Sequence, residues 1–268
     1  MMSAMPEIAN GDVKLWYAER GQPGGLPVVM LHGLFFSRRL FERLADRLPS
    51  HRFLLLDLRG HGRSSRPADV GSYSWRLMAS DVARLLDVLE VEQAVVGGLS
   101  LGADVTLAFA ACHPGRLAGA IVEMPVLDAG RPTAERVFRP LSRLLGGLGE
   151  SMRPVAAASG RLRRLRQPEV AAAADLLSLE PAAGSAMLRG LMDNQDDVRS
   201  GPAALAAGAV PTLVIAHRHD PMHPVDDART VADAVPGARL EVVSSMAELR
   251  LRPGRYAEII GGFLREIA

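Results

Sequence analysis

Six short apolar segments, separated by stretches with helical spacing, limit most strongly how this chain folds. They lie at 28–31, 53–56, 94–96, 120–122, 212–216 and 240–243. Most are rich in β-branched residues and do not alternate with polar ones, which is typical of strands covered on both faces. Apolar stripes of helical period fill the stretches between them. The pattern predicts an α/β fold, a mostly parallel sheet with helices on both faces.

Two further features indicate how the chain begins and how it divides into a core and an insertion. Asn10-Gly11 is a hairpin signal, so we expect the chain to open with an antiparallel pair of strands. Between the strands at 120–122 and 212–216 lie about 89 residues without a convincing strand, which is too long for a simple connection. We therefore predict an inserted helical cap at 127–210 and a core made of 1–126 and 211–268.

Composition and charge narrow the choice of partners and compartment. The 31 basic residues nearly balance the 30 acidic ones, so we expect neither nucleic acid nor an anionic membrane as a partner. Residues 1–11 lack the pattern of a signal peptide, and Ser100 and Asp104 interrupt the longest apolar stretch, 94–112, which argues against a membrane span. The single cysteine, Cys112, favours a reducing, cytoplasmic location.

The sharpest local motif is Gly98-Leu99-Ser100-Leu101-Gly102, which directly follows the apolar segment at 94–96 and precedes an apolar helix. Small residues in this G-x-S-x-G pattern permit a tight strand-to-helix turn that exposes the serine hydroxyl at the positive end of the helix. The same letters also arise by chance in a chain with 26 glycines, where they form a glycine-rich turn with a capping serine.

Further motifs occur in a fixed order around this serine. His32-Gly33 follows the first strand, a D-x-R-G-H-G-x-S loop at 57–64 follows the second, and His219-Asp220-Pro221 comes later. With the serine motif and the helical interval, the chain resembles the α/β-hydrolase superfamily over nearly its whole length. The resemblance implies a sheet of about eight strands, Ser100 at its carboxyl edge, and residues 127–210 as a lid.

The resemblance also implies roles for single residues. Ser100 is the expected nucleophile, and the N–H groups of Leu34 and Leu101 are the expected oxyanion hole. Asp220 stands at the family's usual position for the carboxylate that orients the catalytic histidine, although an aspartate before proline also commonly starts a turn. Glu123, at the end of another strand, is the reserve acid.

The chain differs from the family pattern in the position of the catalytic histidine. The family places its catalytic histidine after the last strand, in a window that falls here at Met246 to Glu248, but no histidine occurs after His223. Glu248 is no equivalent, because a carboxylate is a far weaker base than imidazole. We interpret two other histidines of the family motifs, His32 and His61, as structural.

Three interpretations of the missing histidine stay open. In the first, His223 serves Ser100 from the loop that carries Asp220, since its H-D-P-x-H-P pattern resembles a subgroup that lacks the late histidine, with Glu123 as an alternative group to orient the ring. In the second, Ser100 has no general base, and the protein binds a ligand or acts without hydrolysis. In the third, the chain is an engineered or inactivated variant.

These observations predict a carboxylesterase-like serine hydrolase that cleaves a small ester or thioester with an apolar acyl group through an acyl-enzyme on Ser100. We expect no metal and no organic cofactor. The alternative function is a non-hydrolytic protein of the same fold, either a small-ligand binder or a lyase or cyclase. Dehalogenases and epoxide hydrolases fit less well, because those relatives carry an aspartate where this chain has Ser100. The sequence indicates neither the substrate nor the oligomeric state.

Overall fold

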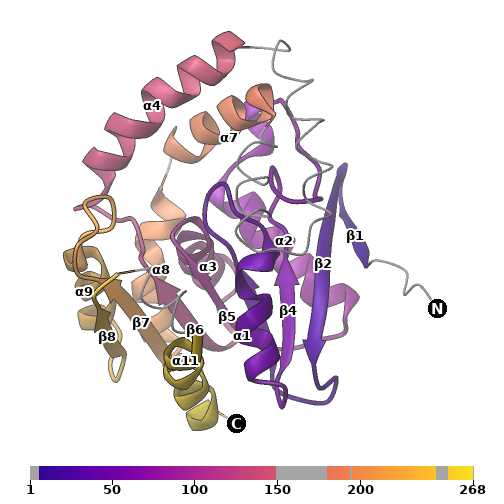
Figure 1. The fold of residues 1–268 in the computed structure, drawn as a ribbon, viewed down its shortest axis with the longest axis vertical. Helices are drawn as coiled ribbons and strands as arrows, with labels where there is room; N and C mark the ends of the chain where they lie inside the picture. Colours follow the sequence, from indigo (N-terminus) through magenta and orange to yellow (C-terminus); the bar gives the residue numbers. More distant parts are fainter. Residues whose placement is uncertain (1–5, 149–179, 194, 246–252, 268) are drawn as a thin grey trace.

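A sheet of eight strands, in the order β1-β2-β4-β3-β5-β6-β7-β8, is the centre of the structure. The structure is a computed structural model that describes residues 6–148, 180–193, 195–245 and 253–267 (Figure 1). The strands are β1 (Glu7–Asn10), β2 (Val13–Gly21), β3 (Pro27–Leu31), β4 (Arg52–Leu56), β5 (Ala94–Leu99), β6 (Leu117–Glu123), β7 (Thr212–His217) and β8 (Arg239–Val243). All pairs from β4 to β8 are parallel, so the predicted mostly parallel α/β sheet is confirmed.

The antiparallel edge of the sheet begins with a hairpin. Asn10 pairs with Val13 across a turn in which Gly11 has a φ of 59°, a left-handed conformation that glycine adopts readily. β2 then runs antiparallel to β4 as well. The antiparallel pair expected from Asn10-Gly11 is therefore confirmed, with Gly11 and Asp12 as the turn.

Helices cover both faces of the sheet, as the apolar strand sequences require. They are α1 (Glu42–Arg47), α2 (Trp75–Val88), α3 (Leu101–Cys112), α4 (Arg131–Leu148), α7 (Pro181–Asp193), α8 (Asp196–Ala207), α9 (Val225–Ala234) and α11 (Pro253–Ile267). In β3, Val28 and Met30 pack with apolar residues of α1 and α11. Val29 and Leu31 alternate with them and pack with residues of α2, α3 and α8 on the other face. No helix within the described ranges is long and apolar enough to cross a bilayer.

The helices of the 127–210 interval lie in two different places. Figure 1 shows α4 and α7 next to one another at the top of the view, beyond the sheet, and α8 beside α3. Val198 and Leu205 of α8 are fully buried in the core, and Gly201 packs against Leu107 of α3. Residues 149–179 lie outside the described part of the chain, so the cap at 127–210 stays a prediction.

The turn from β5 to α3 depends on an unusually close approach of backbones. A Cβ atom on Gly98 would lie 2.5 Å from the carbonyl oxygen of Leu31, and one on Gly102 would lie 2.0 Å from the same atom. Both distances are far below van der Waals contact, and the obstacle is backbone in a central strand, which cannot move aside. The two glycines of the G-x-S-x-G motif therefore allow α3 to pack directly against the end of β3.

This packing predicts that Gly102→Ala destabilises the protein, because the methyl group must displace α3 from β3. We expect the free energy of unfolding in urea to fall by about 3 kcal/mol, at the upper end of typical overpacking costs. Gly147→Ala is the matched control, since Gly147 also lies in a helix but a Cβ there meets nothing within 4 Å. We expect the control to change stability by less than about 1 kcal/mol. Equal stability of the two variants would contradict the close approach.

Candidate active site

Ser100 lies in the turn between β5 and α3 with a backbone conformation that is unusual for a serine. Its φ is 52° and its ψ is −112°, in a region that a residue with a side chain rarely adopts. Hydrogen bonds hold this conformation on both sides: the Ser100 N–H donates to the carbonyl oxygen of Glu123 at 2.8 Å, and the Asp104 N–H donates to the Ser100 carbonyl oxygen at 3.0 Å. Backbone contacts of the neighbouring elements therefore hold Ser100 in a strained conformation.

The Ser100 hydroxyl contacts His223, a residue 123 positions later in the chain. Ser100 Oγ and His223 Nε2 are 2.8 Å apart, which is a hydrogen-bond distance. His223 lies in the loop between β7 and α9, and only about a tenth of its side chain is exposed. The structure therefore brings the predicted nucleophile and the predicted alternative base into direct contact.

Asp220 lies in the same loop as His223, and its carboxylate accepts hydrogen bonds from the backbone of that loop. One carboxylate oxygen, Oδ1, accepts the N–H groups of Met222 at 2.9 Å and of His223 at 3.1 Å. The same oxygen lies 3.1 Å from His223 Nδ1. Nδ1 nevertheless has no partner in hydrogen-bond geometry among the described residues, so we treat this contact as electrostatic. Interaction with His223 is the main cause that lowers the pKa of Asp220 to about 2, against the opposing effect of partial burial.

Glu123, the reserve acid, is fully buried at the end of β6. Its carboxylate accepts a hydrogen bond of 2.6 Å from the Tyr256 hydroxyl and lies 3.1 Å from His217 Nε2. The ring nitrogens of His223 face Ser100 and Asp220. This geometry supports Asp220 over Glu123 as the group that orients His223.

The sequence motifs do not point to His217 or Tyr256. A carboxylate at the end of a covered strand requires buried partners, but the sequence does not indicate which residues supply them. The side-chain contacts of Glu123, together with its backbone bond to Ser100, connect β6, β7 and α11 beneath the serine.

A cavity of about 70 Å³ opens onto Ser100. We call it the serine cavity. It is lined by Leu34, Trp75, Ser100, Leu101, Asp104, Val126, Ala134, Phe138, Leu188, Leu191, Met192, Gln195 and Met222. Leu34 and Leu101 both line this cavity, and their role as an oxyanion hole stays a prediction.

The histidines of the two earlier motifs are bonded to backbone. His32 Nε2 accepts the N–H of Leu58 at 3.1 Å, and its Nδ1 lies 2.9 Å from the carbonyl oxygen of Gly33. His61 Nδ1 lies 3.1 Å from the carbonyl oxygen of Arg59, and burial holds the pKa of His61 well below its usual value. These contacts fit the structural interpretation of both residues.

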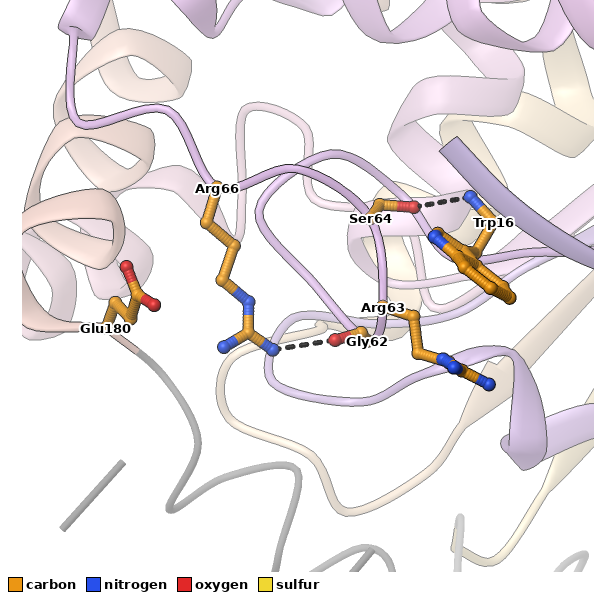
Figure 2. A pocket seen from close by; sticks show the side chains of 6 residues that line it. All are labelled: Trp16, Gly62, Arg63, Ser64, Arg66 and Glu180. Carbon is orange, nitrogen blue, oxygen red and sulfur yellow. Dashed lines mark hydrogen bonds between the residues drawn. The ribbon is translucent and has the colours of Figure 1, made fainter. Parts of the chain in front are cut away.

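A larger groove of about 540 Å³ lies elsewhere, and Figure 2 shows its lining. It is open and polar, and it is bounded by Trp16, Gly62, Arg63, Ser64, Arg66 and Glu180. The Arg63 guanidinium stacks 4.0 Å from the Trp16 ring centre, and Arg66 donates to the Gly62 carbonyl oxygen at 2.7 Å. Because it contains none of the candidate catalytic residues, we take the serine cavity as the site.

Two other predictions concern a metal ion and the position of the family's late histidine. Within the described ranges, no group of three or more His, Cys, Asp or Glu side chains is placed to hold a metal ion. The window at Met246 to Glu248, where the family histidine was expected, lies outside the described residues.

Comparison with known proteins gives one consistent family. Residues 27–247 match the family model described as the alpha/beta hydrolase fold. The 2-hydroxymuconate semialdehyde hydrolase of Pseudomonas sp. CF600 is 28% identical over 259 residues, which is 90% of this chain and 88% of that protein. A thermophilic esterase from Thermogutta terrifontis is 26% identical with a TM-score of 0.76 and 99% of both chains covered. The enol-lactonase of Burkholderia xenovorans LB400, at 23% identity, has a TM-score of 0.78 over 97% of this chain and 100% of that one, and shows the fold alone.

The low pKa of Asp220 generates a test of the His223 contact in solution. We expect His223→Ala to raise the pKa of Asp220 from about 2 toward its ordinary value near 3.8, because its main stabilising partner is gone. A carboxyl-carbon NMR titration measures this directly. Since the folded pKa is lower than the unfolded one, Asp220 stabilises the wild type above about pH 4, and this contribution is lost as the pH falls toward 2.

The unfolding free energy of the variant should therefore depend less on pH between 4 and 2 than that of the wild type. Asp226→Asn is the control, because Asp226 is an exposed aspartate on the neighbouring helix. An unchanged titration of Asp220 in His223→Ala would contradict the contact.

Proposed function

The chain belongs to the α/β hydrolase family, and from this premise we propose that it is a carboxylesterase-like serine hydrolase acting on small esters or thioesters. The relatives support hydrolysis as the reaction class, since they include a semialdehyde hydrolase and an esterase. The observation that carries the proposal is the 2.8 Å contact between Ser100 Oγ and His223 Nε2. We keep the cytoplasm as the proposed compartment, because the chain has one cysteine.

In the proposed mechanism, His223 is the general base. Neutral His223 accepts the Ser100 proton at Nε2 while the serine oxygen attacks the substrate carbonyl. The resulting imidazolium faces the Asp220 carboxylate through Nδ1, and Asp220 stays ionised because its pKa is about 2. His223 then protonates the leaving alcohol or thiol. The acyl group remains on Ser100 until a water molecule, activated by the same histidine, releases it.

The negatively charged oxygen of the tetrahedral intermediate needs hydrogen-bond donors close to Ser100. We propose the backbone N–H groups of Leu34 and Leu101, since both residues line the serine cavity. Leu101 is also the first residue of α3, so the positive end of that helix stabilises the same oxygen. This stabilisation requires no metal or organic cofactor.

The Asp220 turn explains how a histidine only three positions away can serve as base. Asp220 Oδ1 accepts two backbone N–H groups within its own loop, at Met222 and His223. These bonds fold the loop into a tight turn that carries the imidazole toward Ser100. In this proposal, one short loop supplies both the acid and the base.

Helices of the predicted cap supply much of the substrate-binding surface. Ala134 and Phe138 of α4, with Leu188 and Leu191 of α7, line the serine cavity together with Ser100. These side chains are apolar, and the cavity is far smaller than the roughly 300–1,000 Å³ of most ligand pockets. Both properties favour a short acyl group, and we propose that α4 and α7 act as the lid.

An activated serine is the first test of this proposal. We expect a fluorophosphonate probe to label the wild type, because the probe reacts with a serine hydroxyl that has a general base, and to leave Ser100→Ala unlabelled. Labelling is followed by mass spectrometry of the modified peptide. Ser200→Ala is the control and should label like the wild type, since Ser200 lies exposed on α8. A folded wild type that is not labelled would favour the non-hydrolytic function.

The assignment of the base is tested separately. We expect His223→Ala to lower kcat for p-nitrophenyl butyrate by about 10²-fold to 10⁴-fold, the usual range for a lost general base. The matched control is His219→Ala, because His219 is an exposed histidine on the same loop and should keep wild-type turnover. If His223→Ala keeps full activity while its melting temperature is unchanged, another group is the base.

A further inference from the structure

The serine cavity contains two buried polar side chains that the proposed mechanism does not use. Ten of its thirteen lining residues are apolar, and the polar ones are Ser100, Asp104 and Gln195. Asp104 is 3% exposed and Gln195 is 9% exposed. Buried polar groups of this kind normally have hydrogen-bond partners, because leaving one unpaired costs free energy. Their unused hydrogen-bonding capacity therefore indicates what the cavity binds.

Asp104 lies in the first turn of α3, four residues after Ser100. Its Oδ1 accepts the N–H of Val126 at 2.9 Å, which gives that oxygen a structural role. The other oxygen, Oδ2, makes no hydrogen bond to the described residues. Burial, together with the nearby charge of Asp227, raises the pKa of Asp104 well above its usual value. A raised pKa favours protonation, and a protonated carboxyl group can donate one hydrogen bond, whereas a carboxylate can only accept.

Gln195 lies between α7 and α8 and faces the same cavity. Its Oε1 accepts a hydrogen bond from Arg131 Nη1 at 3.2 Å. A guanidinium group only donates, so this contact fixes the orientation of the amide and leaves Nε2 as a donor. Nε2 makes no hydrogen bond to the part of the chain that the structure describes.

We propose that Asp104 and Gln195 are specificity residues that donate hydrogen bonds to an uncharged oxygen in the acyl part of the substrate. The proposal rests on the proposed function and narrows its substrate class to short oxo-acyl esters. Asp104 lies in the first turn of α3, which begins directly after Ser100. A 4-oxopentanoyl group is a short acyl group of this class, with its keto oxygen on the third carbon beyond the scissile carbonyl.

The experiment compares two esters of the same chain length, p-nitrophenyl 4-oxopentanoate and p-nitrophenyl pentanoate. Their hydroxide-catalysed rates are measured first, so that the ratio of kcat/KM values is corrected for intrinsic reactivity. We expect the wild type to prefer the oxo ester about tenfold, the effect of one or two net hydrogen bonds. A corrected ratio near one would overturn the proposal.

Three variants then assign the preference to residues. Gln195→Met keeps the side-chain length but lacks the donor, so the corrected ratio should fall by about fivefold, an effect expected of one lost hydrogen bond. Asp104→Asn keeps an acceptor for the Val126 N–H and a donor for the cavity, so it should retain most of the preference. Gln22→Met is the matched control, because Gln22 is exposed and outside the cavity. An unchanged ratio in Gln195→Met, or a preference abolished in Gln22→Met, would overturn the assignment.

A protein that hydrolyses neither ester would contradict the proposed function without deciding the inference. Binding of 4-oxopentanamide and pentanamide to Ser100→Ala then decides it, with saturation-transfer NMR as the measurement. Tighter binding of the oxo amide, weakened in a Ser100→Ala/Gln195→Met double variant, supports the two donors. Equal binding of the two amides overturns the inference.

Discussion

The direct packing of α3 against the end of β3 is the constraint on which the rest of the site depends. Gly98 and Gly102 allow two backbones to approach at distances that any side chain would prevent. The chain turns between them with a positive φ at Ser100, so the serine hydroxyl emerges beside the N-terminus of α3. Because the serine is held by central elements of the core, it stays in one position while surrounding loops and helices supply the other groups.

In the proposed mechanism, the loop after β7 supplies the catalytic histidine that the chain lacks after β8. In its short turn, Asp220 binds two backbone N–H groups and also faces the imidazole of His223. Placing both groups on one loop removes the need for a second segment to be positioned against the serine. Nδ1 of His223 faces the carboxylate without hydrogen-bond geometry.

The buried polar groups around Ser100 fall into two sets with different surroundings. Glu123 and its partners His217 and Tyr256 lie beneath the serine, where their contacts hold three elements together. Asp104 and Gln195 lie at the cavity, and each has one atom bonded to protein and another without a bond to the described residues. The first set therefore has a structural role. The second set distinguishes this cavity from a purely apolar one, which is why we connect it with the substrate.

The sequence by itself determined the architecture and the nucleophile turn, because both depend on local pattern. Unalternating β-branched runs predicted the strands of a covered sheet, and the glycines around Ser100 predicted the tight turn. The contact between Ser100 and His223, 123 positions apart, was one of several open interpretations, since spacing along the chain does not say which loops meet. Likewise, α8 falls within the predicted cap but packs on α3. The apolar residues Val198 and Leu205 indicate that one face of α8 is covered, but the sequence does not show which element covers it. Only the tertiary structure decided these points, since which side chains meet depends on how the sheet brings distant segments together.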